Sequence, residues 1–130
     1  MSGTGDRVQP DRSEEGSAMR KRRFNAKAHR LAALRADGWP IAEDVERRLA
    51  SGHVTQDFLG FGDIILYHPR RGWWLEQVTV ESALERHLKA AMANGKVEHW
   101  KVMGFGARIV VYPDRADREE GDMEPRVVVI

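Results

Sequence analysis

The sequence predicts an α/β fold in which helices pack on a mixed β-sheet. Apolar residues recur with helical spacing in three stretches, and they form short β-branched or aromatic runs in several others. Along the chain the expected elements follow the order α, β, β, β, α, α, β, β. Helices are therefore interspersed with runs of strands, which suggests a mixed sheet packed by helices.

Length and composition indicate one domain. A chain of 130 residues can bury one core but not two. Residues 1–19 are polar, rich in Gly and Ser, and offer almost nothing to bury, so we expect a disordered tail before a single domain at 20–130. We find no signal-peptide core and no apolar run long enough to span a bilayer, which leads us to expect a cytoplasmic protein with no membrane partner.

Composition also excludes some chemistry. The chain has no cysteine, so it forms neither a disulfide nor a thiolate metal site. Its five histidines are scattered without an i, i+4 pair, which argues against a zinc enzyme. No glycine-rich phosphate loop of the P-loop or dinucleotide-binding type is present.

The first expected elements are a helix and a short strand. Apolar spacing predicts a helix over about residues 24–36, and Gly38 with Pro40 provides its stop signal. The next segment fits two interpretations. We favour a strand over about 41–47, and the alternative is an amphipathic turn.

A β-hairpin is expected next. The run "DIILYH" at 63–68 is β-branched and aromatic, "HPRRG" at 68–72 is typical of a turn, and "WWLEQVT" at 73–79 reads as a second strand.

Two helices and two strands complete the expected order. Ser82 and Glu85 have the spacing of a capping box, which predicts a helix start at Ser82. That helix is expected to end at "NG", residues 94–95. A second short helix follows, and strands "ARIVVY" and "RVVVI" flank an acidic loop at 114–124. The residues expected to face the core from the two helices are Leu84, Leu88, Ala91, Met92, Val97 and Trp100, with Val102 or Met103 beside them.

The register of the hairpin decides which polar residue shares a face with Asp63. If residues 68–72 form the loop, Asp63 lies opposite Gln77, and we expect Glu76 to face solvent. A slip of one residue places Asp63 opposite Val78 and brings Glu76 onto its face instead. The sequence leaves this choice open.

An acid and an oxygen donor at facing strand positions are suited to a hard divalent cation. Mg²⁺ or Mn²⁺ takes oxygen ligands, and Mg²⁺ often binds through one or two carboxylates together with a phosphate. Such an ion polarises a phosphodiester and lowers the pKa of a bound water. The neutral amide of Gln77 would make a weaker site with Asp63 than a second carboxylate would.

The stretch "DFLGFGDIILYHPRRGWWLEQVT" at 57–79, followed by a helix with Arg86 and Lys89, resembles the small resolvase-like nucleases of the PD-(D/E)XK superfamily found in phages and prophages. The similarity extends over about residues 24–130. It implies a restriction-endonuclease-like mixed sheet of α-β-β-β-α-β order. It also implies a Mg²⁺- or Mn²⁺-dependent DNA nuclease that hydrolyses phosphodiester bonds, with a homodimer as the candidate assembly.

The resemblance places the principal metal-binding aspartate at Asp63. The second acid and the lysine of the superfamily motif fall on Gln77 and Thr79, with the main-chain carbonyl of Val78 as a further ligand. Since Gln77 and Thr79 carry no charge, the alternative is a catalytically degenerate nucleic-acid-binding protein on the same fold.

Two further acids match upstream positions of the family. Glu46 maps onto an acid found on or after the first helix, and Asp57 opens the run before the hairpin. Either would complete the metal site or orient the waters of the ion. Glu76 is the other candidate ligand, should the hairpin register slip.

Basic residues are candidates for DNA contact. Arg86 and Lys89 lie three apart on one helical face, and Arg70 and Arg71 lie in the hairpin turn. Each pair either binds phosphate or is an ordinary exposed surface. The run at 20–30 holds six Lys or Arg and no acid, which makes it the best electrostatic footprint for nucleic acid; the alternative is a basic helix start.

Overall fold

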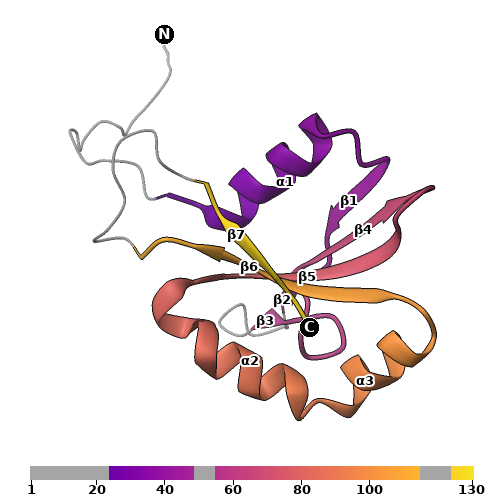
Figure 1. The fold of residues 1–130 in the computed structure, drawn as a ribbon. Helices are drawn as coiled ribbons and strands as arrows, with labels where there is room; N and C mark the ends of the chain where they lie inside the picture. The colour runs from indigo at the N-terminus through magenta and orange to yellow at the C-terminus, as the bar shows by residue number, and fades with distance from the viewer. Residues whose placement is uncertain (1–23, 49–54, 115–123) are drawn as a thin grey trace, which may run out of the picture.

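The structure is a computed structural model that describes residues 24–48, 55–114 and 124–130 (Figure 1). The expected tail at 1–19, the basic residues 20–23 and most of the acidic loop therefore lie outside the described residues.

The predicted mixed sheet is confirmed. Five strands lie in the order β1-β4-β5-β6-β7. Neighbouring strands are antiparallel except for β5 and β6, which are parallel. The strands are β1 (Ile41–Asp44), β4 (Ile64–His68), β5 (Gly72–Val80), β6 (Gly106–Tyr112) and β7 (Arg126–Val129). Two short strands, β2 (Arg47–Arg48) and β3 (Thr55–Gln56), pair separately.

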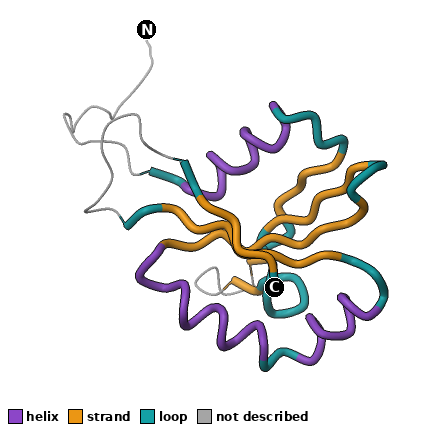
Figure 2. The backbone as a smooth tube through the Cα atoms, viewed as in Figure 1, coloured by secondary structure: helices purple, strands orange, loops and turns teal. Residues whose placement is uncertain are grey.

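Helices cover both faces of the sheet. Helix α1 (Ala26–Ala36) packs on one face, and α2 (Leu84–Met92) and α3 (Gly95–Val102) pack on the other (Figures 1 and 2). Each face has its own apolar cluster. On the α1 side it contains Leu34, Trp39, Ala42, Ile64 and Leu66. On the α2–α3 side it contains Phe61, Leu75, Ala91, Val97, Trp100, Ala107, Ile109 and Val111. None of the described helices is long and apolar enough to cross a membrane.

The hairpin adopts the first of the two registers considered above. Tyr67 pairs with Trp73, and Ile64 pairs with Glu76. His68 also pairs with Gly72, so the turn itself contains only residues 69–71. The ladder ends at Ile64 and Glu76, and the N–H of Asp63 donates to the carbonyl of Glu76 at 2.8 Å.

The segment after α1 is a shorter strand than expected. Strand β1 ends at Asp44; the N–H of Val45 still donates to the carbonyl of Asp63 at 2.8 Å, and the chain then leads into β2. The expected strand over 41–47 is thus two strands separated by a bend at Val45 and Glu46.

The expected capping box is wrong. Ser82 lies inside a 3₁₀ turn, η1 (Glu81–Ala83), and α2 begins only at Leu84 without a side-chain cap. The main-chain N–H of Ser82 donates to the Asp114 carboxylate at 3.0 Å, a contact from outside the local sequence.

The "NG" pair begins a helix, whereas we expected it to end one. Asn94 caps α3, and its Oδ1 accepts the main-chain N–H groups of Lys96 and Val97 at 2.9 and 3.3 Å. Val97 and Trp100 are buried as expected. Three residues expected at the core are exposed: Met92, Val102 and Met103.

Glu76 is buried, and the expectation that it faces solvent is wrong. Its side chain has no exposed surface and points to the α1 side of the sheet. Arg30 on α1 donates to both carboxylate oxygens at 2.9 and 2.8 Å, and Arg108 on β6 donates at 2.7 Å. The Arg108 guanidinium also lies 4.8 Å from the centroid of the Trp74 ring. Two arginines therefore compensate a carboxylate that burial alone would make unstable.

We predict that Glu76→Gln lowers the free energy of unfolding by about 3–5 kcal/mol, because it leaves two partly buried guanidinium groups without their carboxylate. Denaturant unfolding would measure the change. The matched control is Glu81→Gln, since Glu81 also binds an arginine through both oxygens, at 2.7 and 2.9 Å, but at an exposed position. That control is expected to be nearly neutral. Equal effects of the two substitutions would contradict the prediction.

Candidate metal centre

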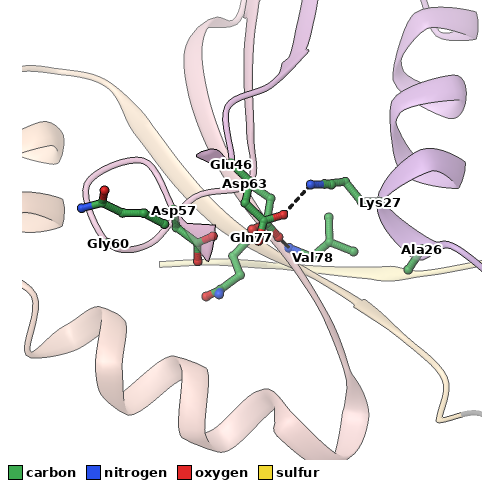
Figure 3. A pocket seen from close by; sticks show the side chains of 9 residues that line it. Ala26, Lys27, Glu46, Asp57, Gly60, Asp63, Gln77 and Val78 are labelled. Carbon is green, nitrogen blue, oxygen red and sulfur yellow. Dashed lines mark hydrogen bonds and ion pairs between the residues drawn. The ribbon is translucent and has the colours of Figure 1, made fainter. Parts of the chain in front are cut away.

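A pocket forms where β5 extends beyond the start of β4. The ladder between β4 and β5 ends at Ile64 and Glu76, whereas β5 remains paired with β6 as far as Val80. Beyond Glu76, β5 therefore lacks the β4 neighbour. A cavity of about 600 Å³ lies in this region (Figure 3). It is lined by Ala26, Lys27, Glu46, Gln56, Asp57, Gly60, Asp63, Gln77 and Val78.

Asp63 takes the place of the missing strand neighbour. Its main-chain N–H donates to the carbonyl of Glu76, and its own carbonyl accepts the N–H of Val45, both at 2.8 Å. Its carboxylate Oδ2 accepts the main-chain N–H of Val78 at 2.9 Å. The chain thus holds Asp63 on both sides and directs its carboxylate into the pocket.

Three carboxylates from three segments meet in this pocket. Glu46 follows the bend after β1, Asp57 follows β3, and Asp63 precedes β4. One oxygen of each lies within 4.8 Å of the other two. Ligand oxygens on opposite sides of a bound Mg²⁺ or Ca²⁺ are about 4–5 Å apart. The three side chains are therefore close enough to contact a single hard cation.

This proximity disfavours the ionised form of Asp63. Burial raises the pKa of Asp63 to about 7, and the charge of Asp57 adds to the rise against the opposing effect of the Val78 hydrogen bond. Burial also raises the pKa of Asp57, and the charge of Glu46 contributes. The pocket therefore holds more negative charge than its surroundings stabilise, and protons or a cation would relieve it.

Lys27 supplies a positive charge in the same pocket. Its Nζ lies 2.5 Å from Glu46 Oε1 and 2.9 Å from Asp44 Oδ2. Burial by itself would lower the pKa of Lys27, but the hydrogen bonds and charges of Glu46 and Asp44 outweigh it and raise that pKa. Lys27 therefore stays protonated. The sequence did not single it out, because its partners come from a different segment.

The described part of the basic run at 20–30 does not form a free cationic surface. Lys27 binds Glu46 and Asp44, and Arg30 binds the buried Glu76. Both cations are therefore used within the fold, and residues 20–23 lie outside the described residues.

Of the β5 residues expected at the site, two line the pocket and two do not. Gln77 lines the pocket and is 8% exposed, and its amide has no hydrogen-bond partner among the described residues. In Figure 3 this amide extends away from the Asp63 carboxylate. Val78 also lines the pocket and contacts Asp63 through its main-chain N–H. Thr79 is buried and is not among the lining residues. Glu76 faces the opposite side of the sheet, so it is not a ligand here.

The four basic residues expected to contact DNA lie outside the pocket. Arg86 and Lys89 are exposed on α2. Arg70 and Arg71 are at the hairpin turn, at the other end of β4 from Asp63. Arg71 lies 3.5 Å from Asp37 and stacks over the Trp39 ring.

We predict that Asp63→Asn stabilises the protein above pH 7. The pKa of Asp63 is raised from its ordinary value of 3.8 to about 7, so its ionisation costs stability increasingly as pH rises from 3.8 to 7, and fully above 7. The variant should gain roughly 1–3 kcal/mol at pH 8, and the gain should shrink as pH falls towards 4. Thermal unfolding at several pH values measures this.

The matched control is Asp37→Asn, which removes one carboxylate at an exposed position away from the pocket. A variant Asp63→Asn that is less stable than the wild type at pH 8 would contradict the prediction.

No family model, curated protein or solved structure matches this chain.

Proposed function

We propose that this chain is a DNA nuclease that hydrolyses phosphodiester bonds with Mg²⁺ or Mn²⁺ held by Glu46, Asp57 and Asp63. The observation that carries the proposal is the meeting of these three carboxylates within 4.8 Å, with the ammonium group of Lys27 bound to one of them. The order α1, β1, β4, β5, α2, β6 agrees with the α-β-β-β-α-β order that the resemblance implies, and so supports a restriction-endonuclease-like fold.

The donor set fits a hard divalent cation. All three groups are carboxylates, the preferred ligands of Mg²⁺ and Mn²⁺. Gln77 lines the same cavity, but its amide extends away from the Asp63 carboxylate (Figure 3), so the donor set rests on the three carboxylates. Glu46 and Asp57 would supply the negative charge that the family motif has in the carboxylate at the position of Gln77.

When bound, the cation would polarise the phosphodiester and stabilise charge on the leaving oxygen. The chain itself contributes the placement of the ligands and one fixed positive charge. The carboxylates of Asp57, Asp63 and Glu46 would hold the ion at the end of the sheet. Lys27 stays protonated and is suited to bind a phosphate oxygen as a point charge. It would serve in place of the motif lysine, at whose position this chain has Thr79.

The approach of DNA follows from the surroundings of the pocket. His87 on α2 is close enough to Asp57 for their charges to interact, so α2 runs beside the site. Arg86 and Lys89 on this helix are the basic residues that would bind the DNA backbone next to the cleaved bond. Contact of Arg70 and Arg71 with DNA, and a homodimeric assembly, stay predictions.

We predict that the wild type nicks supercoiled plasmid, or cuts branched or linear DNA, with Mg²⁺ or Mn²⁺ and not with EDTA. Asp63→Ala should lower the rate by about 100-fold or more, since even residues behind metal ligands cost 10–100-fold. Asp37→Asn should cleave as the wild type does. Cleavage that persists in Asp63→Ala would place the active site elsewhere.

We predict that Lys27→Gln separates cation binding from cleavage. Removing a positive charge from the acidic pocket should leave Mn²⁺ binding intact or tighter, while cleavage falls about 10²–10³-fold, the usual cost of losing one transition-state electrostatic contact. Calorimetric titration with Mn²⁺ and the plasmid assay measure the two effects. Lys101→Gln, on the exposed side of α3, is the matched control. Loss of Mn²⁺ binding in Lys27→Gln would show instead that Lys27 only holds Glu46 in place.

A second candidate function is nucleic-acid binding without cleavage. The uncharged Gln77 and Thr79 at the positions of an acid and a lysine favour it. This alternative predicts DNA binding that weakens steeply with salt, because phosphate contacts release counterions. It also predicts no cleavage with any metal, and Asp63→Ala would bind DNA as the wild type does.

A further inference from the structure

The loop at 57–62 carries one of the three carboxylates, and it is closed by its own backbone and packed on the α2–α3 side through Phe58, Leu59 and Phe61. The N–H of Phe58 donates to the carbonyl of Gly62 at 2.9 Å, and the N–H of Gly62 donates to that of Phe58 at 2.9 Å. The N–H of Gly60 donates to the carbonyl of Asp57 at 3.0 Å. These bonds fix the shape of the loop, but they do not fix its position relative to the rest of the pocket.

The tip of this loop has a constrained backbone. Leu59 has φ of 59°, the left-handed region that a leucine rarely occupies, and Gly60 follows with φ of 69°. A residue other than glycine in this region costs about 1–3 kcal/mol and persists only where its surroundings determine it. The side chain of Leu59 packs against the α2–α3 apolar cluster, and a polar contact to its main-chain carbonyl adds to the hold on the tip.

Asn94 makes that contact. Its side-chain Nδ2 donates to the carbonyl of Leu59 at 2.9 Å, across 35 residues of sequence. The same side chain caps α3 through its Oδ1, so it cannot turn away from the loop without uncapping the helix. A methyl group at Gly60 would lie 3.6 Å from the Asn94 Nδ2, so the two residues pack closely.

The ends of the loop are held in different ways. Phe61 is buried in the α2–α3 cluster and anchors the end that leads to Asp63. The end that carries Asp57 follows the two-residue strand β3, whose described partner is the equally short β2, and the ring of Phe58 beside it packs edge-on against Trp100 of α3 at 6.1 Å. The Asn94 contact is thus a second link, and a polar one, between this loop and α3.

We propose that Asn94 is a positioning residue that tethers the 57–62 loop to the start of α3 and so keeps Asp57 within reach of Glu46 and Asp63 for cation binding. This inference rests on the proposed function of that site. Asn94 touches neither the cation nor the substrate and acts only through the loop.

The test is Asn94→Ser in the full chain. Serine is as good a helix cap as asparagine, so α3 keeps its start, but serine has no amide N–H to donate to Leu59. Calorimetric titration with Mn²⁺ should show binding about three- to tenfold weaker than in the wild type, the effect expected for one hydrogen bond. Hydrogen exchange of the Phe58, Gly60 and Gly62 amides should become faster.

The matched control is Gly95→Ala. It changes the next residue of α3, where an added methyl group meets nothing within 4 Å, and it leaves the tether intact. It should keep wild-type Mn²⁺ affinity and amide exchange. Wild-type Mn²⁺ affinity in Asn94→Ser would overturn the proposal.

The failure of this inference is distinct from the failure of the proposed function. A wild type that does not bind Mn²⁺ would overturn the cation site itself. Amide exchange would then still decide the tether: unchanged exchange of the loop amides in Asn94→Ser would overturn it, and faster exchange would support it.

Discussion

The ion pairs of the buried Glu76 with Arg30 and Arg108 are the constraint on which the site depends. They join α1, β5 and β6, three elements that are far apart in the sequence. Because side chains alternate along a strand, holding Glu76 on the α1 face sends Gln77 and Thr79 to the face that α2 and α3 cover. A slip of one residue in β5 would move the Glu76 carboxylate away from its arginines and bury the unpaired amide of Gln77 in its place. The network therefore favours one register of β5, beyond what hydrophobic alternation achieves.

The pocket is a consequence of unequal strand lengths. Strand β5 continues past the point at which β4 begins, so the N–H of Val78 needs an acceptor that the β4 backbone does not provide. The carboxylate of Asp63 fills that role. An aspartate at the mouth of a buried strand is thus explained first by backbone satisfaction, since an unpaired buried N–H is costly. The same position brings Asp63 beside Asp57 and Glu46, and the resulting repulsion is a cost of folding that the ammonium group of Lys27, bound to Glu46, partly offsets.

Local patterns predicted much of the fold and only part of the site. The hairpin and the succession of helices and strands follow from apolar periodicity and turn chemistry, which act over a few residues, whereas the same signals left the hairpin register open between two choices. The burial of Glu76 could not be predicted in this way, because Arg30 and Arg108 lie 46 and 32 residues away. Lys27 was missed for the same reason, as its Glu46 contact spans 19 residues. Local signals also failed where a distant group replaced them, as Asp114 does at Ser82.

The charged groups of the pocket come from segments other than β5, where the motif that the resemblance implies would place them. The motif would carry an acid and a lysine on the strand that follows Asp63, and this chain has the neutral Gln77 and Thr79 there. Glu46, Asp57 and Lys27 bring two carboxylates and an ammonium group to the same cavity from other segments. Three carboxylates and one ammonium sum to a charge of about −2 when all are ionised, which one divalent cation would balance. Under the proposed function, α1, the bend after β1 and the 57–62 loop would supply the charged groups that the resemblance implies on the second strand of the hairpin.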